Sequence, residues 1–145
     1  MAANRAGSTT SGAANATSVD VPALTTSDIY LRAGSPGGFG DGNPAFQQSL
    51  NGPYGMAVDQ AGNIYIADTS NHRLRFVPKV AGTYFGQAMV ANNVYTIAGT
   101  GVATYSGDTG PATAGAINGP IGVSVDGAGN IYIADTGNNR IRFIP

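Results

Sequence analysis

Two short polar segments carry most of the side chains that could bind a ligand. DTSNHR occupies residues 68–73, and DTGNNR occupies residues 135–140. Asp accepts hydrogen bonds, whereas Asn, His and Arg can donate them in defined directions. Such a set suits a surface that holds a polar ligand or a partner protein. The candidate binding residues are Asp68, Asn71, His72, Arg73, Asp135, Asn138, Asn139 and Arg140.

The same residues also suit a structural role. Asp68 and Asp135 begin the two segments, and an Asp at a tight turn accepts hydrogen bonds from loop N–H groups or pairs with a nearby Arg. We therefore expect these two Asp residues, together with the Asn three positions after each, to serve the turns first. Positions at which the segments differ, such as His72 against Asn139, are better candidates for ligand contact.

The sequence gives little support for catalytic or metal chemistry. It contains no Cys and no Glu, and His72 is its only His, so several His or Cys ligands cannot gather within one chain. The loops at Asp41 and Asp108 lack the dense oxygen ligands of a calcium-binding loop, and no Lys-Ser or Lys-Thr follows the glycines at positions 34–40. We predict no catalytic residue, no metal site and no cofactor.

The composition narrows the class of protein. The 145 residues are 42% hydrophobic and 10% charged, with a formal net charge of −1. This suits one ordinary domain and lacks the basic excess of a nucleic-acid-binding protein. No apolar run is long enough to span a membrane. We predict a flexible tail over residues 1–27, which has almost no large apolar side chains, and a folded region over residues 28–145.

The folded region contains an internal repeat. NGPYGMAVDQAGNIYIADTSNHRLRFVP at residues 51–78 returns as NGPIGVSVDGAGNIYIADTGNNRIRFIP at residues 118–145, with 20 of the 28 positions identical. A weaker similarity upstream relates residues 29–34 to residues 94–99. Apolar residues alternate with a period of two, and many are β-branched or aromatic, which is typical of strands.

Each repeat is predicted to form a meander of four strands, which in the first copy cover residues 55–58, 64–67, 73–77 and 94–98. Both faces of the second strand are apolar, so both faces of the sheet must be covered. Stacking of four-stranded blades around an axis provides such covers. A two-layer sandwich is the alternative, but it leaves one face of each sheet to solvent. The sequence therefore favours an all-β fold of antiparallel propeller blades, with two blades per chain.

The pattern GPxGVxVDxAGNIYIADTxNxRIR, preceded by YTIAGTG and YSGDTGPAT, resembles the NHL repeat. The resemblance covers about residues 29–145. It implies a β-propeller, usually of six blades, that binds proteins, RNA or other ligands, although a minority of related propellers are metal-dependent lyases or lactonases. Residues 79–93 depart from the pattern as an insertion, which we expect to form a structured loop or an extra turn at the end opposite the polar turns.

Two blades cannot close a ring, because propellers have about four to eight. The order of the predicted strands offers two solutions. A blade-closing strand at residues 29–33 comes first, a full blade spans residues 50–99, and a partial blade at residues 117–145 stops after its third strand. Three copies can close as a homotrimer in which each first strand completes the neighbour's last blade. Alternatively, the chain is a fragment of a longer array.

A non-catalytic binding scaffold is the leading functional interpretation. Its loop face would combine the polar turns with the connections at residues 37–43 and 105–110, and would contact a protein or a small molecule. The alternative is a metal-dependent lyase or lactonase-like enzyme with its site on the ring axis. We expect no nucleic-acid or membrane partner. Few Lys, many Asn, Thr and Gly residues and the resemblance to long bacterial repeat arrays favour an extracellular or cell-surface location over the cytoplasm.

Overall fold

A computed structural model describes residue 27 and residues 29–145 of the chain, so the predicted tail lies almost wholly outside the described residues. The chain divides into two units, Met1–Tyr30 and Leu31–Pro145. The second unit holds every strand discussed below. Within the part of the chain that the structure describes, no helix is long and apolar enough to cross a membrane.

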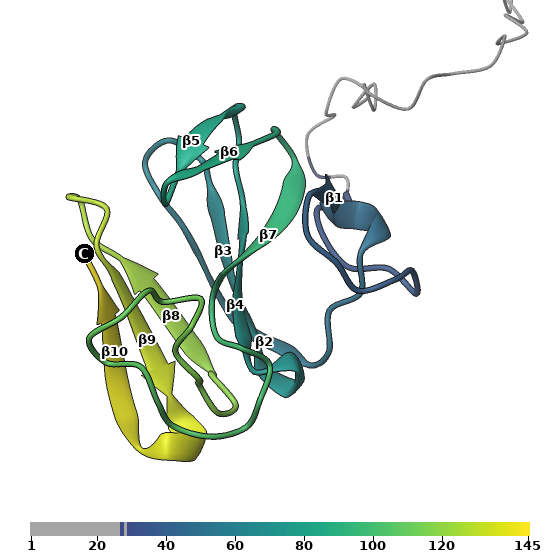
Figure 1. Ribbon diagram of the computed structural model, residues 1–145. Helices are drawn as coiled ribbons and strands as arrows, with labels where there is room; N and C mark the ends of the chain where they lie inside the picture. The colour runs from purple at the N-terminus through teal and green to yellow at the C-terminus, as the bar shows by residue number, and fades with distance from the viewer. Residues whose placement is uncertain (1–26, 28) are drawn as a thin grey trace, which may run out of the picture. The chain divides into compact units, whose positions relative to one another are not determined.

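The first repeat forms an antiparallel meander (Figure 1). β2 (Pro53–Val58), β3 (Ile64–Asp68), β4 (Arg73–Val77) and β7 (Asn93–Ala98) lie across the sheet in that order, and the short β1 (Asn43–Pro44) pairs with the outer side of β7. The four strands predicted from the alternating pattern are confirmed, with differences only at their ends.

The second repeat forms a separate antiparallel sheet beside the first (Figure 1). Its strands are β8 (Gly122–Val125), β9 (Ile131–Asp135) and β10 (Arg140–Ile144). The turns that follow β3 and β9 have the same form, a 3₁₀ turn closed by a residue in the left-handed conformation. That residue is His72 at φ 53° in the first repeat and Asn139 at φ 55° in the second.

The hairpin loops at the other end of the sheets also repeat. Asp59 accepts hydrogen bonds from the backbone and side chain of Asn63, and Asp126 does the same for Asn130. The pKa of Asp126 is lowered, mainly by the hydrogen bond that the Asn130 side chain donates to it. Each loop thus has an Asp whose carboxylate accepts from the N–H groups of the loop Asn, which explains why the Asp-x-x-x-Asn spacing occurs in both repeats.

The insertion at residues 79–93 is a two-stranded hairpin of β5 (Gly82–Tyr84) and β6 (Gln87–Met89). It lies at the end of the first sheet opposite the turn between β3 and β4, as expected (Figure 1). Met89 is buried in the main core, and the rings of Tyr84 and Phe85 pack on Phe76 with centroids 5.2 and 5.3 Å away. The insertion therefore extends the core and is ordered by it.

Residues 29–33, predicted as a blade-closing strand, have no regular secondary structure in the single chain. The side chains of Ile29 and Leu31 are exposed. The sheets of the described residues include no strand at residues 29–33. The blade-closing role of residues 29–33 consequently stays a prediction that requires a partner strand.

Apolar side chains cover both faces of the first sheet, as the alternating pattern predicts. On one face Tyr65, Leu74 and Phe76 pack against Ile131 and Ile133 of the second sheet. On the other face a smaller cluster is covered by the segment that precedes β2, and its buried residues are Ala45, Ile66, Val77 and Val94. The second sheet is thus held against the first by a shared core.

Replacement of Val94 by Ala tests the smaller cluster. Val94 is buried, so we expect Val94→Ala to lower the free energy of unfolding by about 2 kcal/mol, from the lost methyl burial and the cavity left behind. Val80 is exposed on the insertion, and Val80→Ala is the matched control with an expected loss below about 0.5 kcal/mol. Urea denaturation measures the unfolding free energy of both variants. Equal losses would contradict the burial of Val94 in this cluster.

Candidate functional site

The polar turns and the polar connections meet at one end of the two sheets. The guanidinium of Arg73 donates to the carbonyl oxygen of Thr100 at 2.8 Å, and Asn138 donates to the carbonyl oxygen of Thr104 at 2.9 Å. We call this end the loop face and define it by residues 37–43, 68–73, 99–110 and 135–140. The strand directions bring these segments together, as the meander predicted.

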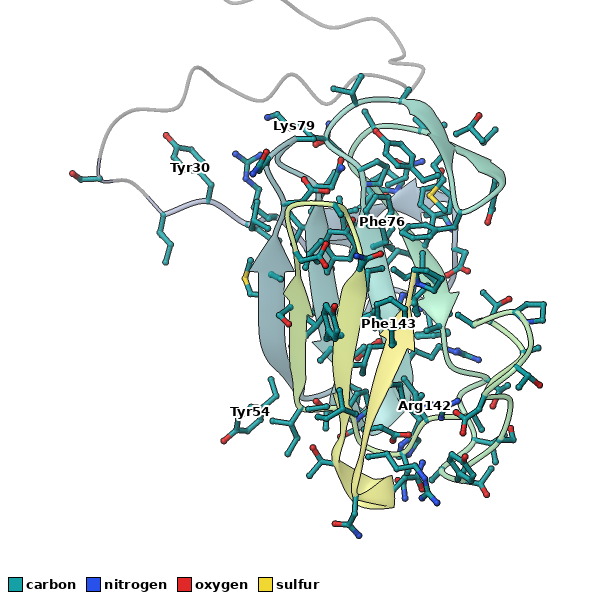
Figure 2. The ribbon with its side chains drawn as sticks, turned by 90° about the vertical axis from the view of Figure 1, so that its left-hand side faces the viewer. Tyr30, Tyr54, Phe76, Lys79, Arg142 and Phe143 are labelled. Carbon is teal, nitrogen blue, oxygen red and sulfur yellow. The ribbon has the colours of Figure 1, made fainter. Side chains whose placement is uncertain are left out.

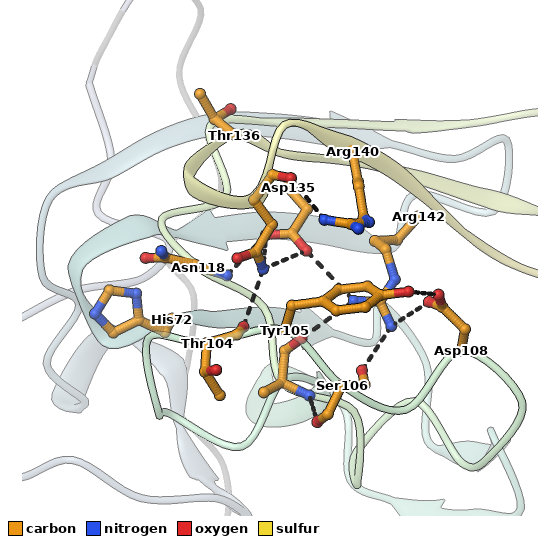
Figure 3. Close-up of polar contacts among 12 residues, drawn as sticks. His72, Thr104, Tyr105, Ser106, Asp108, Asn118, Asp135, Thr136, Arg140 and Arg142 are labelled. Carbon is orange, nitrogen blue, oxygen red and sulfur yellow. Dashed lines mark hydrogen bonds and ion pairs between the residues drawn. The ribbon is translucent and has the colours of Figure 1, made fainter.

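In the second repeat, the buried Asp135 holds the turn and its surroundings together (Figure 3). Its carboxylate accepts hydrogen bonds from the backbone N–H of Asn118 at 2.7 Å and from the side chain of Asn138 at 2.9 Å. Arg142 Nη1 lies 3.3 Å from the same carboxylate. The acceptor capacity of Asp135 is therefore used within the fold.

Asp68 has the same place in the first repeat. It is fully buried, and its carboxylate accepts from the backbone N–H of Asn51 at 2.7 Å and from the side chain of Asn71 at 2.8 Å. In both repeats the Asp and its Asn partner therefore hold the turn together, as the sequence predicted. A ligand would have to replace these contacts to reach either carboxylate.

An arginine–aromatic cluster covers the outer part of the second turn (Figure 3). Arg142 Nη2 lies 2.7 Å from Asp108 Oδ1 and donates to the carbonyl oxygen of Ser106 at 2.9 Å. The ring of Tyr105 lies 3.8 Å from the guanidinium carbon of Arg140 and 5.2 Å from that of Arg142. The Tyr105 hydroxyl donates to Asp108, which raises the pKa of the phenol.

The first repeat has a matching cluster with Phe39 as its ring. The guanidinium carbons of Arg73 and Arg75 lie 4.8 and 4.5 Å from the centre of this ring. Arg75 is fully buried, and its Nη2 lies 3.0 Å from Asp41 Oδ1. Burial lowers the pKa of Arg75, and the charge of Asp41 opposes that effect. Stacking on the ring compensates part of the cost of burying this cation.

His72 connects the two repeats. Its Nδ1 accepts a hydrogen bond from the backbone N–H of Gly119 at 3.0 Å, and the neighbouring Thr69 hydroxyl donates to the carbonyl oxygen of Pro120 at 2.7 Å. The predicted binding residue therefore has a structural contact through one ring nitrogen, with Nε2 as its other polar atom. Over the described ranges, no group of three His, Cys, Asp or Glu residues is placed to hold a metal ion.

A shallow polar depression of about 520 Å³ lies on the first repeat between the loop face and β6. Its lining includes Phe39, Asp41 and Arg73, together with Thr96, Thr100 and Gln87. The Thr96 hydroxyl donates to Asp41 Oδ1 at 3.0 Å. The depression thus combines donors, an acceptor and one aromatic surface.

The eight candidate residues differ in whether they line the depression and in how exposed they are. Among them only Arg73 lines the depression, whereas Asn139 and Arg140 are exposed at the second turn. Sequence reasoning missed the roles of Phe39 and Tyr105. A signal was present, because each connection carries an aromatic residue two or three positions before the Asp that pairs with Arg75 or Arg142.

Comparison with known families accounts for the repeated turn and strand pattern. The family described as NHL repeat matches residues 50–75 and 118–142. The chain contains two NHL repeats. Each match runs from the segment before the first strand of a repeat into its third strand, so it includes the buried Asp and the turn after it. NHL repeats imply propeller blades, and the fourth strand of the first repeat, β7, lies outside the matched residues.

Known proteins with similarity to these NHL repeats are much longer. Protein SUPPRESSOR OF QUENCHING 1, chloroplastic, of Arabidopsis thaliana is 30% identical over 95 residues, which are 66% of this chain and 8% of that protein. A Bacteroides thetaiotaomicron protein of unknown function is 28% identical with a TM-score of 0.58, over 77% of this chain and 26% of that one. An auxiliary nutrient binding protein of the same species is 24% identical with a TM-score of 0.57, and the match covers 80% of this chain and 28% of that protein.

The two acidic partners of Arg142 provide a test of the buried carboxylate. Asp135→Ala leaves the N–H groups of Asn118 and Asn138 without their acceptor, so we expect it to lower the free energy of unfolding by about 1–3 kcal/mol. Asp108 is half exposed, and Asp108→Ala should cost less than about 1 kcal/mol. Denaturant unfolding of both variants checks this order. A larger loss for Asp108→Ala would contradict the structural role of Asp135.

Proposed function

We propose that the two NHL repeats form a non-catalytic binding module whose loop face holds a ligand. The observation that carries this proposal is the depression at Phe39, Asp41 and Arg73, where an aromatic surface and oriented polar groups converge. Such convergence is typical of sites that bind small molecules. The eight candidate residues of the turns frame this face, with Arg73, Asn139 and Arg140 as its accessible donors.

The arrangement of the depression is fixed before a ligand enters. One nitrogen of Arg73 is held by the carbonyl oxygen of Thr100, and its guanidinium lies against the ring of Phe39. A side chain that is already ordered loses less conformational entropy when it binds. The preferred ligand is a small polar molecule that offers acceptors to Arg73, a donor to Asp41 and a flat or apolar surface to Phe39.

The comparisons support a binding role through the fold. Two of the solved structures with this fold, from Bacteroides thetaiotaomicron and Bacteroides ovatus, are described as auxiliary nutrient binding proteins, each at 24% identity and with TM-scores of 0.57 and 0.53. A small-molecule ligand and an extracellular or cell-surface location are therefore part of the proposal. The metal-dependent enzyme gains no support from the described residues, which place no three potential metal ligands together.

Fragment binding followed by two-dimensional amide NMR tests the site. The probe is a library of small polar compounds, including sugars, amino acids and carboxylic acids. We expect the shifts of bound fragments to gather at Arg73, Thr96 and Thr100, and Arg73→Ala to weaken those fragments at least tenfold. Lys79 is an exposed cation on the insertion, so Lys79→Ala is the matched control and should leave affinity unchanged.

Two outcomes would contradict the proposed site. Fragments that gather at the opposite hairpin loops, residues 59–63 and 126–130, would place the binding surface elsewhere. Equal affinity of the Arg73→Ala and Lys79→Ala proteins would show that the guanidinium in the depression makes no contribution.

A further inference from the structure

The depression on the first repeat is lined by segments that lie far apart in the sequence. The connection before β1 supplies Phe39 and Asp41, and β7 with the connection after it supplies Thr96 and Thr100. Gln87 comes from β6 of the insertion, outside the residues that the NHL repeat family matches. The insertion therefore contributes a polar side chain that the repeat itself does not provide.

The two charged side chains in the depression have polar atoms to spare. Asp41 Oδ1 lies 3.0 Å from Arg75 Nη2 and accepts from the Thr96 hydroxyl at 3.0 Å, whereas no described residue donates to Asp41 Oδ2. Arg73 Nη2 donates to the carbonyl oxygen of Thr100 at 2.8 Å, and no described residue accepts from Arg73 Nε or Nη1. A ligand in the depression therefore meets one free acceptor and two free donors.

These charges do not favour a charged ligand. An acid would bind Arg73 but would meet the Asp41 carboxylate in the same depression, and the free oxygen of that carboxylate requires a donor. A cation would meet Asp41, whose charge is already paired with the buried Arg75, and would be repelled by Arg73. A hydroxyl group both donates and accepts, so the hydroxyls of one neutral ligand can satisfy both side chains.

The neutral lining groups have the same dual character. Thr96, Thr100 and Thr113 carry hydroxyls, and the Gln87 amide has one acceptor and two donors. The Thr96 hydroxyl donates to Asp41 and can still accept, whereas the Thr100 hydroxyl accepts a loop N–H at 3.3 Å and can still donate. The depression thus offers donors and acceptors side by side, which matches a ligand with several hydroxyls.

Phe39 adds an apolar surface to these polar groups. Its side chain is 47% exposed, and the guanidinium groups of Arg73 and Arg75 lie over its ring. The two cations already use the attraction of the ring for positive charge, so the exposed part of the ring does not favour a further cation. A saturated ring with C–H groups on one face can lie on Phe39 while the hydroxyls at its edge reach the polar lining.

We propose that the depression binds the ring of a neutral sugar. The C–H face of the sugar lies on Phe39, and its hydroxyls donate to Asp41 Oδ2 and accept from Arg73. Gln87 of the insertion bonds a further hydroxyl and so helps to select among sugars. This inference rests on the proposed binding function and narrows its ligand to one chemical class.

Amide NMR of the full chain with matched sugars tests the ligand class. The probes are the methyl pyranosides of glucose, galactose and mannose, each beside its uronic acid and its 2-amino analogue. We expect at least one neutral pyranoside to shift the amides of Thr96 and Thr100, and to bind about tenfold more tightly than its charged analogues.

The outcomes separate this inference from the proposed function. Acids, amino sugars or amino acids that bind at the depression while the neutral pyranosides do not would overturn the sugar assignment and leave the binding function in place. If neither these probes nor the fragment library shift the amides of Thr96 and Thr100, both the sugar assignment and the proposed site are wrong.

Phe39→Ala tests the apolar contact. Loss of the ring should weaken the neutral pyranoside about tenfold. Tyr54→Ala is the control, because Tyr54 is 78% exposed on β2 and points away from the sheets (Figure 2), and it should leave affinity unchanged. Equal affinities of the Phe39→Ala and Tyr54→Ala proteins would overturn the stacking.

Gln87→Ala tests the contribution of the insertion without touching the buried arginine beneath Phe39. Gln87 is exposed, so this variant should fold, and the loss of one hydrogen bond should weaken the neutral pyranoside about threefold. Gln60 is exposed in the hairpin loop at residues 59–63, and Gln60→Ala is the matched control that should bind as the unmodified chain does. Equal affinities of the two Gln variants would overturn the role of the insertion.

Discussion

Both faces of each sheet are apolar, and this constraint determines most of the structure. A four-stranded sheet of this kind must lie between two apolar layers, because exposed aliphatic and aromatic area costs free energy in proportion to its size. The first sheet meets the requirement with the second sheet on one side and, over β3, β4 and β7, with the segment before β2 on the other, while Met56 and Val58 of β2 stay exposed. The second sheet meets it on one side only, which is why Ile141 and Phe143 are exposed.

The polar end of the molecule depends on the same packing. The shared core fixes the position of the two turns, and the buried carboxylates of Asp68 and Asp135 then organise the surrounding N–H groups. Because Asp68 and Asp135 are occupied within the turns, the side chains that stay accessible at this end are arginines and aromatic rings outside the turns. Arg73 with Phe39 and Arg140 with Tyr105 are the results, one pair in each repeat.

The sequence predicts the strands and the turn role of Asp68 and Asp135, because alternation and repeat identity report local geometry and burial directly. It does not predict the contacts of His72 with Gly119 or of Phe39 with Arg75, since these join residues 47 and 36 positions apart through the packing of loops. The insertion was expected as a loop or extra turn, and its hairpin form reflects aromatic packing on Phe76. Residues 29–33 have the sequence pattern of a strand but no regular secondary structure, because a strand also requires a partner strand.

Amide hydrogen exchange along β10 tests the two-face requirement most directly. β4 lies between two strands and between two apolar layers, so at low protein concentration the amides of Arg73–Val77 will exchange more slowly than those of Arg140–Ile144 in β10. Equal exchange rates in β4 and β10 would contradict the account.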